Sequence, residues 1–225
     1  MAIAIFGSLC AGWVAASPAT ADGAPRWGGF YVGAGIGAIG LSGDERDRHT
    51  VPPHTDKTSG DRGWGVLGSV GAGYDFHLSK DIIAGAFTEF DFTNADFNVH
   101  TSGGDTNSLE QNNAFNVGGR IGFLAAPSTL VFGEGGYSRG KFDFDYADEY
   151  STNKSFDGWF VGVGAEQKIT EALSIKLGYR FTQYDEEKVG VIAPPPPAVD
   201  QEEHFIDADS HSIRLGLNYN LGIGQ

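Results

Sequence analysis

The feature of this sequence that most limits its fold is a two-residue alternation of apolar side chains with glycine or polar side chains. The alternation recurs in eight stretches, which begin near Phe30, Trp64, Ile82, Phe115, Leu130, Trp159, Leu173 and Ile213. Period two is typical of a β-strand whose two faces meet different surroundings, and no helical period competes with it. The chain is therefore predicted to be all-β, with eight strands.

The connections between these stretches alternate between short and long. Residues 78–81, 125–128 and 170–172 are short turns, whereas residues 41–62, 93–112, 147–157 and 186–209 are long. Short turns at one end and long loops at the other are typical of outer-membrane barrels. This pattern predicts an eight-stranded, antiparallel, up-and-down transmembrane β-barrel.

The polar face of the alternation indicates which side of the barrel wall meets lipid. Glycine supplies 34 of the 225 residues, and much of it falls on this face. The larger polar side chains there are charged, with nearly balanced signs: Glu89, Asp91, Arg120, Glu166, Lys168, Lys176, Arg180 and Arg214. Small and paired residues suit the narrow lumen of an eight-stranded barrel, whereas an Arg facing lipid at mid-bilayer costs roughly 2–4 kcal/mol. We therefore expect a charge network in the lumen and apolar side chains toward lipid; a soluble periplasmic barrel, with the faces reversed, is the alternative.

The fifth stretch allows two registers. If Val131 and Tyr137 face lipid, Glu134 points inward and can meet Arg120 on the neighbouring strand. If Leu130 and Phe132 face lipid instead, Glu134 is placed in hydrocarbon, which is costly for a charged group. The first register is favoured, and it adds Glu134 to the predicted lumen network.

Aromatic residues recur near the strand ends, as they do in the interfacial girdles of membrane barrels. The predicted girdle consists of Trp27, Phe30, Trp64, Phe76, Trp159, Tyr179 and Tyr219.

The start of the chain predicts export. Residues 1–21 carry no charge and end in Ala19-Thr20-Ala21, which resembles the cleavage site of a secretory signal peptide, although Lys and Arg are missing from its first residues. Residues 22–225 would then form the barrel domain. A single Cys excludes a disulfide framework and a Cys-built metal site, and the net charge of −14 argues against nucleic-acid binding.

Three segments carry a family resemblance: residues 27–33 (WGGFYVG), 158–166 (GWFVGVGAE) and 170–181 (TEALSIKLGYRF). They resemble strands of the small Gram-negative outer-membrane β-barrel family, the porin-like or OmpA/opacity-like proteins. The resemblance implies a surface-exposed protein of the outer membrane with a role in envelope integrity or host contact. It also implies four kinds of partner: outer-membrane lipids, lipopolysaccharide, the barrel-assembly machinery, and a host or surface ligand of the long loops. Family members usually end on Phe, whereas here Tyr219 and Leu221 would have to serve assembly.

Other motifs predict no cofactor, metal or catalytic site. The glycines of residues 35–40 match a dinucleotide fingerprint, but no helix follows to bind a pyrophosphate. The six histidines show no ligand spacing on a shared element, and the acidic loop residues suit solvated loops better than a cation site. His211 and Ser212 are adjacent on one strand and face opposite sides, so they cannot cooperate in an esterase triad.

The predicted function is therefore that of a non-enzymatic outer-membrane barrel with structural and surface-interaction roles. Its lumen would be plugged by the charged network. A narrow porin that passes small solutes is the alternative, in which the same network opens transiently.

Overall fold

The computed structural model describes residues 27–50, 53–59, 63–100, 106–146, 150–192 and 202–224. Within these ranges no helix is long and apolar enough to span a membrane. The predicted signal peptide, residues 1–21, lies outside the described residues, as does the proline run of residues 194–197.

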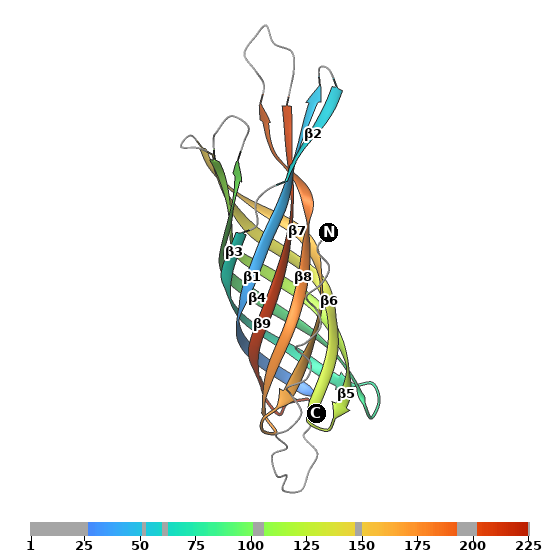
Figure 1. Cartoon of the computed structure of the whole chain (residues 1–225). Coiled ribbons are helices and arrows are strands. Elements are labelled where there is room, and N and C mark those ends of the chain that lie inside the picture. Colours follow the sequence, from blue (N-terminus) through green and yellow to red (C-terminus); the bar gives the residue numbers. More distant parts are fainter. Residues whose placement is uncertain are drawn as a thin grey trace, which may run out of the picture.

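Eight long strands form a closed antiparallel barrel (Figure 1). They are β1 (Gly29–Thr50), β3 (Gly63–His77), β4 (Ile82–His100), β5 (Thr106–Ala126), β6 (Thr129–Tyr146), β7 (Tyr150–Lys168), β8 (Leu173–Ile192) and β9 (Glu202–Asn220). Each pairs with the next, and β9 pairs with β1 to close the ring. A further strand, β2 (Pro53–Ser59), pairs only with the outer part of β1. The predicted fold class is confirmed, with β2 as an addition.

The three short turns occur where they were predicted, but much of the predicted long loops is strand. β1 continues to Thr50 and β9 begins at Glu202, so these strands have 22 and 19 residues. A bilayer needs only about 9–11 residues of tilted strand. Beyond the bilayer both faces meet water, so the apolar alternation is lost although the backbone ladder continues. The sequence pattern therefore marked only the membrane-spanning part of each strand.

The two faces of the wall are arranged as predicted. Outward-facing Ile36 and Val163 are 66% and 62% exposed, whereas inward-facing Arg180 and Glu166 are 1% and 3% exposed. This arrangement excludes a soluble barrel, which would bury its apolar residues. On β6, Val131 and Tyr137 are exposed outside and Glu134 lies inside, so the first of the two registers is the one observed.

Trp27 departs from the predicted aromatic girdle. It is 3% exposed, and its indole N–H donates to the carbonyl oxygen of Pro127 at 2.9 Å. Trp27 precedes β1, so strand alternation does not apply to it, and its ring turns into the barrel end. The other six predicted girdle residues are exposed on the outer surface: Phe30, Trp64, Phe76, Trp159, Tyr179 and Tyr219.

Candidate functional site

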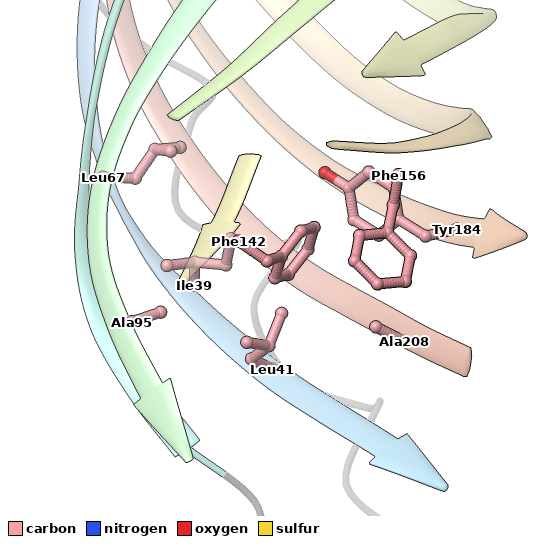
Figure 2. Close-up of a cluster of buried hydrophobic side chains, with 8 residues drawn as sticks. All are labelled: Ile39, Leu41, Leu67, Ala95, Phe142, Phe156, Tyr184 and Ala208. Carbon is pink, nitrogen blue, oxygen red and sulfur yellow. The ribbon is translucent and has the colours of Figure 1, made fainter. Parts of the chain in front are cut away.

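The lumen is filled by side chains in successive apolar and ionic layers. At the loop end is the loop-side cluster, which consists of Ile39, Leu41, Leu67, Ala95, Phe142, Phe156, Tyr184 and Ala208 (Figure 2). The ring of Phe142 meets those of Phe156 and Tyr184 edge-to-face, at centroid distances of 5.0 and 5.1 Å. Such contacts are favourable arrangements of aromatic pairs, and here they pack apolar atoms into the loop end of the lumen.

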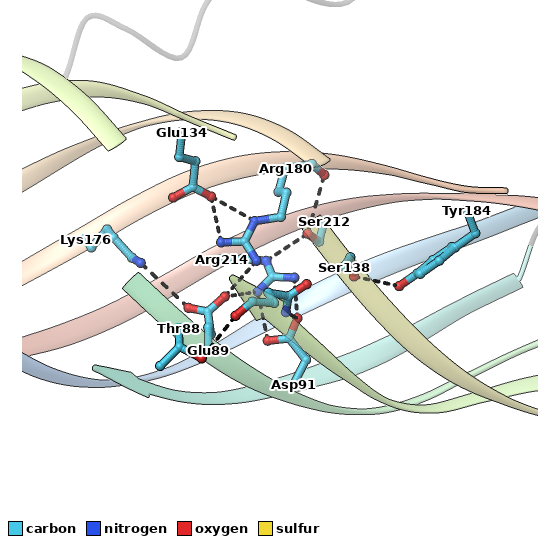
Figure 3. A network of polar contacts seen from close by, with 11 residues as sticks. Thr88, Glu89, Asp91, Glu134, Ser138, Lys176, Arg180, Tyr184, Ser212 and Arg214 are labelled. Carbon is cyan, nitrogen blue, oxygen red and sulfur yellow. Dashed lines mark hydrogen bonds and ion pairs between the residues drawn. The ribbon is translucent and has the colours of Figure 1, made fainter. Parts of the chain in front are cut away.

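Below this cluster lies the upper ionic layer, formed by Glu89, Asp91, Glu134, Lys176, Arg180 and Arg214 (Figure 3). Glu89 Oε1 accepts hydrogen bonds from Nη1 of Arg180 at 2.8 Å and from Nη1 of Arg214 at 2.7 Å. Arg214 also binds Asp91 through both terminal nitrogens, at 2.9 Å each. Bidentate charge-assisted bonds of this kind combine strength with geometric specificity.

An aromatic layer separates the upper ionic layer from a second one. It consists of Tyr31, Phe87 and Phe160. The guanidinium of Arg180 lies 4.4 Å from the Phe160 ring centroid, and that of Arg120 lies 4.8 Å from the Tyr31 centroid. Cation–π contacts thus stabilise both arginines against the same apolar layer.

The lower ionic layer is centred on Arg120. Its Nε donates to Asp75 Oδ1 at 2.9 Å, and its Nη1 donates to Glu166 Oε2 at 2.8 Å. Glu166 also accepts a hydrogen bond from the Ser174 hydroxyl. All three charged side chains are buried, so each depends on the others for compensation.

At the turn end of the lumen lies the turn-side cluster, which consists of Trp27, Ile83, Leu130 and Phe132, with Leu124 packed against it. The ammonium of Lys168 lies 5.2 Å from the Trp27 ring centroid. The predicted lumen residue Lys168 therefore caps this cluster and forms no described salt bridge, whereas the other predicted lumen charges lie in the two ionic layers.

A glycine lies between two of the lumen charges that form an ion pair. Glu134 and Arg120 are direct register partners, as the sequence suggested, but Glu134 forms its ion pair with Arg180. Gly162 lies between Glu134 and Arg180 in the ladder, and a Cβ there would stand 3.0 Å from the Glu134 carboxylate. Because Gly162 has no side chain, the side chains of Glu134 and Arg180 can contact each other across β7. The predicted Glu134–Arg120 pair is therefore incorrect, because Asp75 and Glu166 already bind Arg120.

Sequence reasoning missed two parts of this site. Asp75 was not among the predicted lumen charges, although its parity on β3 matches that of Gly71 and Gly73. With Asp75, the charged groups named in the lumen are five carboxylates and five cations. The two apolar clusters were also missed, because the inward face was expected to be polar over its whole length. Ile39 and Leu41 lie on the same face of β1 as the inward-facing glycines, and this pattern could have predicted an apolar cluster in the lumen.

The space left between the layers is small. One cavity of about 30 Å³ is lined by Tyr31, Glu89, Lys176 and the glycines of β1, and another of about 10 Å³ lies beside Arg120. A buried water needs about 10–15 Å³. These two cavities therefore have the size of water sites.

The outer wall carries His211, the histidine nearest to a serine in sequence. Its Nδ1 lies 2.6 Å from the Tyr179 hydroxyl, and its Nε2 lies 3.4 Å from Asp209 Oδ2. Ser212 is buried on the opposite face of β9, as strand alternation requires. Where side chains are described, no three His, Cys, Asp or Glu residues are placed to bind a metal.

Comparisons with known proteins agree with this architecture. A family model for an outer membrane protein beta-barrel domain matches residues 6–220. The chain is 26% identical over 237 residues to the 31 kDa outer-membrane immunogenic protein of Brucella melitensis, which covers 95% of this chain and 93% of that protein. It is 29% identical over 196 residues to the 22 kDa outer membrane protein of Rhizobium leguminosarum bv. viciae, covering 86% and 78%.

Among solved structures, the outer membrane protein OprG from Pseudomonas aeruginosa has a similar fold. The TM-score is 0.55 at 12% identity, with 85% of this chain and 95% of that chain covered. The closed barrel, its apolar outer wall and the match over nearly the whole chain lead to one conclusion. The chain belongs to the outer membrane protein β-barrel family and is an integral outer-membrane protein of a Gram-negative bacterium.

Proposed function

We propose that this protein is a non-conducting structural barrel of the outer membrane. The observation that supports this function is the unbroken series of filled layers across the lumen, from the loop-side cluster to the turn-side cluster. Eight-stranded barrels have interiors just wide enough for side chains. Here the ionic layers are compensated and both ends are closed by apolar residues, so an ion would have to displace several buried contacts to pass.

Planar-bilayer recording of the refolded barrel tests this function. We expect no steady conductance when insertion is verified in the same preparation by the shift in gel mobility between unheated and boiled samples. Steady single-channel openings would contradict the proposal and would support the alternative function, a narrow porin.

We also propose that lipopolysaccharide binds the outer wall at the loop-side edge of the membrane. On β6, Arg139 and Lys141 are exposed on the outer face, beyond Tyr137. Arg139 lies 3.6 Å from Asp157, a distance that leaves most of its donors available. Cations just outside an aromatic belt are suitably placed for lipid phosphates.

Thermal stability in the presence and absence of lipopolysaccharide tests this surface. The added stabilisation should fall in an Arg139→Gln/Lys141→Gln variant. It should persist in Lys80→Gln, which removes a cation from the opposite rim. Equal stabilisation of both variants would exclude this wall as the site.

The assembly machinery and a surface ligand remain proposed partners. Tyr219 and Leu221 are exposed at the turn end of β9, where the assembly machinery could recognise them. A non-enzymatic role is supported by the separation of His211 and Ser212 across the wall. Unchanged lipid A in cells that carry His211→Ala is the expected result.

A further inference from the structure

The residues that follow β9 lie over the seam at which the barrel closes. The seam is the pairing of β1 with β9, and at the turn end its last pair is Tyr31 opposite Asn220. Residues 221–224 continue from β9 beyond this pair and remain attached to the outer wall, as the contacts below show. We call these four residues the seam strap.

Backbone hydrogen bonds attach the seam strap to the start of β1. The N–H of Phe30 donates to the carbonyl oxygen of Ile223 at 3.0 Å, and the N–H of Leu221 donates to the carbonyl oxygen of Phe30 at 2.8 Å. Phe30 lies one residue beyond the last pair of the β1–β9 ladder. The strap therefore supplies the partners that the ladder no longer provides, and unpaired backbone groups are costly where lipid excludes water.

Side chains hold the seam strap at both of its ends. Asn220 donates through Nδ2 to the carbonyl oxygen of Gly28 at 2.8 Å, and its Oδ1 accepts a hydrogen bond from the N–H of Gly222 at 2.9 Å. At the far end, the hydroxyl of Tyr74 on β3 donates to the carbonyl oxygen of Gly224 at 2.7 Å. The strap thus connects β9 to β3 across β1.

Two glycines give the seam strap its path. Gly222 and Gly224 have φ angles of 70° and 79°, in the left-handed region that residues with a side chain rarely adopt. The rings of Phe30 and Tyr74 pack on each other with centroids 4.7 Å apart. A Cβ at Gly224 would stand 2.9 Å from the Tyr74 ring, so the strap lies directly against this aromatic pair.

We propose that the seam strap slows the reopening of the closed barrel between β1 and β9. This seam joins the first and last strands of the barrel. Its contacts close a longer loop than those of any other neighbouring pair in the ring, so we expect them to form late in folding. Interactions that form after the transition state slow unfolding and have little effect on the folding rate. The strap should therefore determine how long the barrel stays closed.

Unfolding kinetics of a chain that ends at Asn220 test the proposal. In detergent and urea, the shortened barrel should unfold at least about tenfold faster, because the three hydrogen bonds from the strap to Phe30 and Tyr74 are lost. Its refolding rate should stay within about twofold of that of the full chain. Unfolding at the rate of the full chain would overturn the proposal, as would a loss confined to the refolding rate.

Two substitutions at Gly222 form a matched pair that keeps the strap at full length. A Cβ at this position meets nothing within 4 Å, so an effect must come from the backbone conformation. Asn tolerates the left-handed region, whereas a β-branched residue does not. Gly222→Val should unfold nearly as fast as the shortened chain, and Gly222→Asn should unfold like the native chain. Equal unfolding rates of the two variants would contradict the proposal.

Hydrogen exchange in the unaltered chain gives a measurement that does not depend on the folding of a variant. The Phe30 amide should be protected, because the strap accepts its hydrogen bond. Val131 on β6 is the reference, since it also lies near the turn end but belongs to a strand that does not form the seam. In the shortened chain only Phe30 should lose protection. Rapid exchange of Phe30 in the native barrel would overturn the proposal.

Discussion

Gly162 is a small residue on which a large electrostatic contact depends. It separates Glu134 from Arg180 in the ladder, and the two charged side chains join across the space that its missing side chain leaves. Gly85 has the same position between Asp75 and Arg120. At these two positions the charged residues reach each other across an intervening strand that has no Cβ.

Gly162→Ala should therefore destabilise the barrel. The new Cβ would stand 2.8 Å from the Tyr179 carbonyl oxygen and 3.0 Å from the Glu134 carboxylate, so the buried ion pair must shift. Gly133→Ala is the matched control, because a Cβ there meets nothing closer than 3.8 Å. The measurement is the temperature at which heating converts the folded barrel, seen by its gel mobility, into the unfolded form. This temperature should fall for Gly162→Ala and change little for Gly133→Ala.

Substitution of Arg180 tests how much the buried ion pairs contribute to the free energy of unfolding. Arg180→Met leaves Glu89 and Glu134 without this partner, and removing one member of a buried pair costs about 3–5 kcal/mol. Arg139→Met breaks an exposed pair with Asp157, for which about 0–1 kcal/mol is expected. Urea unfolding in detergent measures both variants, and similar losses in the two would argue against a compensated lumen.

At the scale of elements, each strand combines a membrane-spanning part with a part that continues beyond the bilayer. On β8 the outward side chains change from apolar Leu177 near the middle to polar Gln183 toward the loops. This change marks the depth at which lipid contact ends, and it explains why the apolar alternation underestimated the strand lengths.

Arginine substitutions along β8 can measure this depth. Leu177→Arg should cost roughly 2–4 kcal/mol, because it places a charge near mid-bilayer, whereas Gln183→Arg should cost about 0–1 kcal/mol. Gln183 lies opposite Asp209, which can partner the new cation. Folding yield into lipid vesicles gives the ranking, and the reverse order would mean that this face does not meet acyl chains.

At the scale of the whole molecule, the three tryptophans of the described residues report the orientation of the wall. Trp159 is 44% exposed on the outer surface, whereas Trp27 is buried inside the turn end. In single-tryptophan variants reconstituted with brominated acyl chains, Trp159 fluorescence should be strongly quenched and Trp27 fluorescence largely preserved. Strong quenching of Trp27 would place it outside the barrel and remove the turn-side closure.

The sequence by itself determined the number of barrel strands, the facing of their residues and the near balance of lumen charge. These properties depend on the two-residue alternation, which is visible within a single strand and requires no knowledge of its neighbours. The sequence also predicted that Glu134 faces the lumen, because only one of the two possible registers keeps its carboxylate out of the lipid.

Only the tertiary structure decided which groups meet. Arg120 binds Asp75 and Glu166 while Glu134 binds Arg180, and Trp27 packs into the turn-side cluster. These contacts join residues on different strands, and barrel closure and register, which no local pattern encodes, bring such residues together.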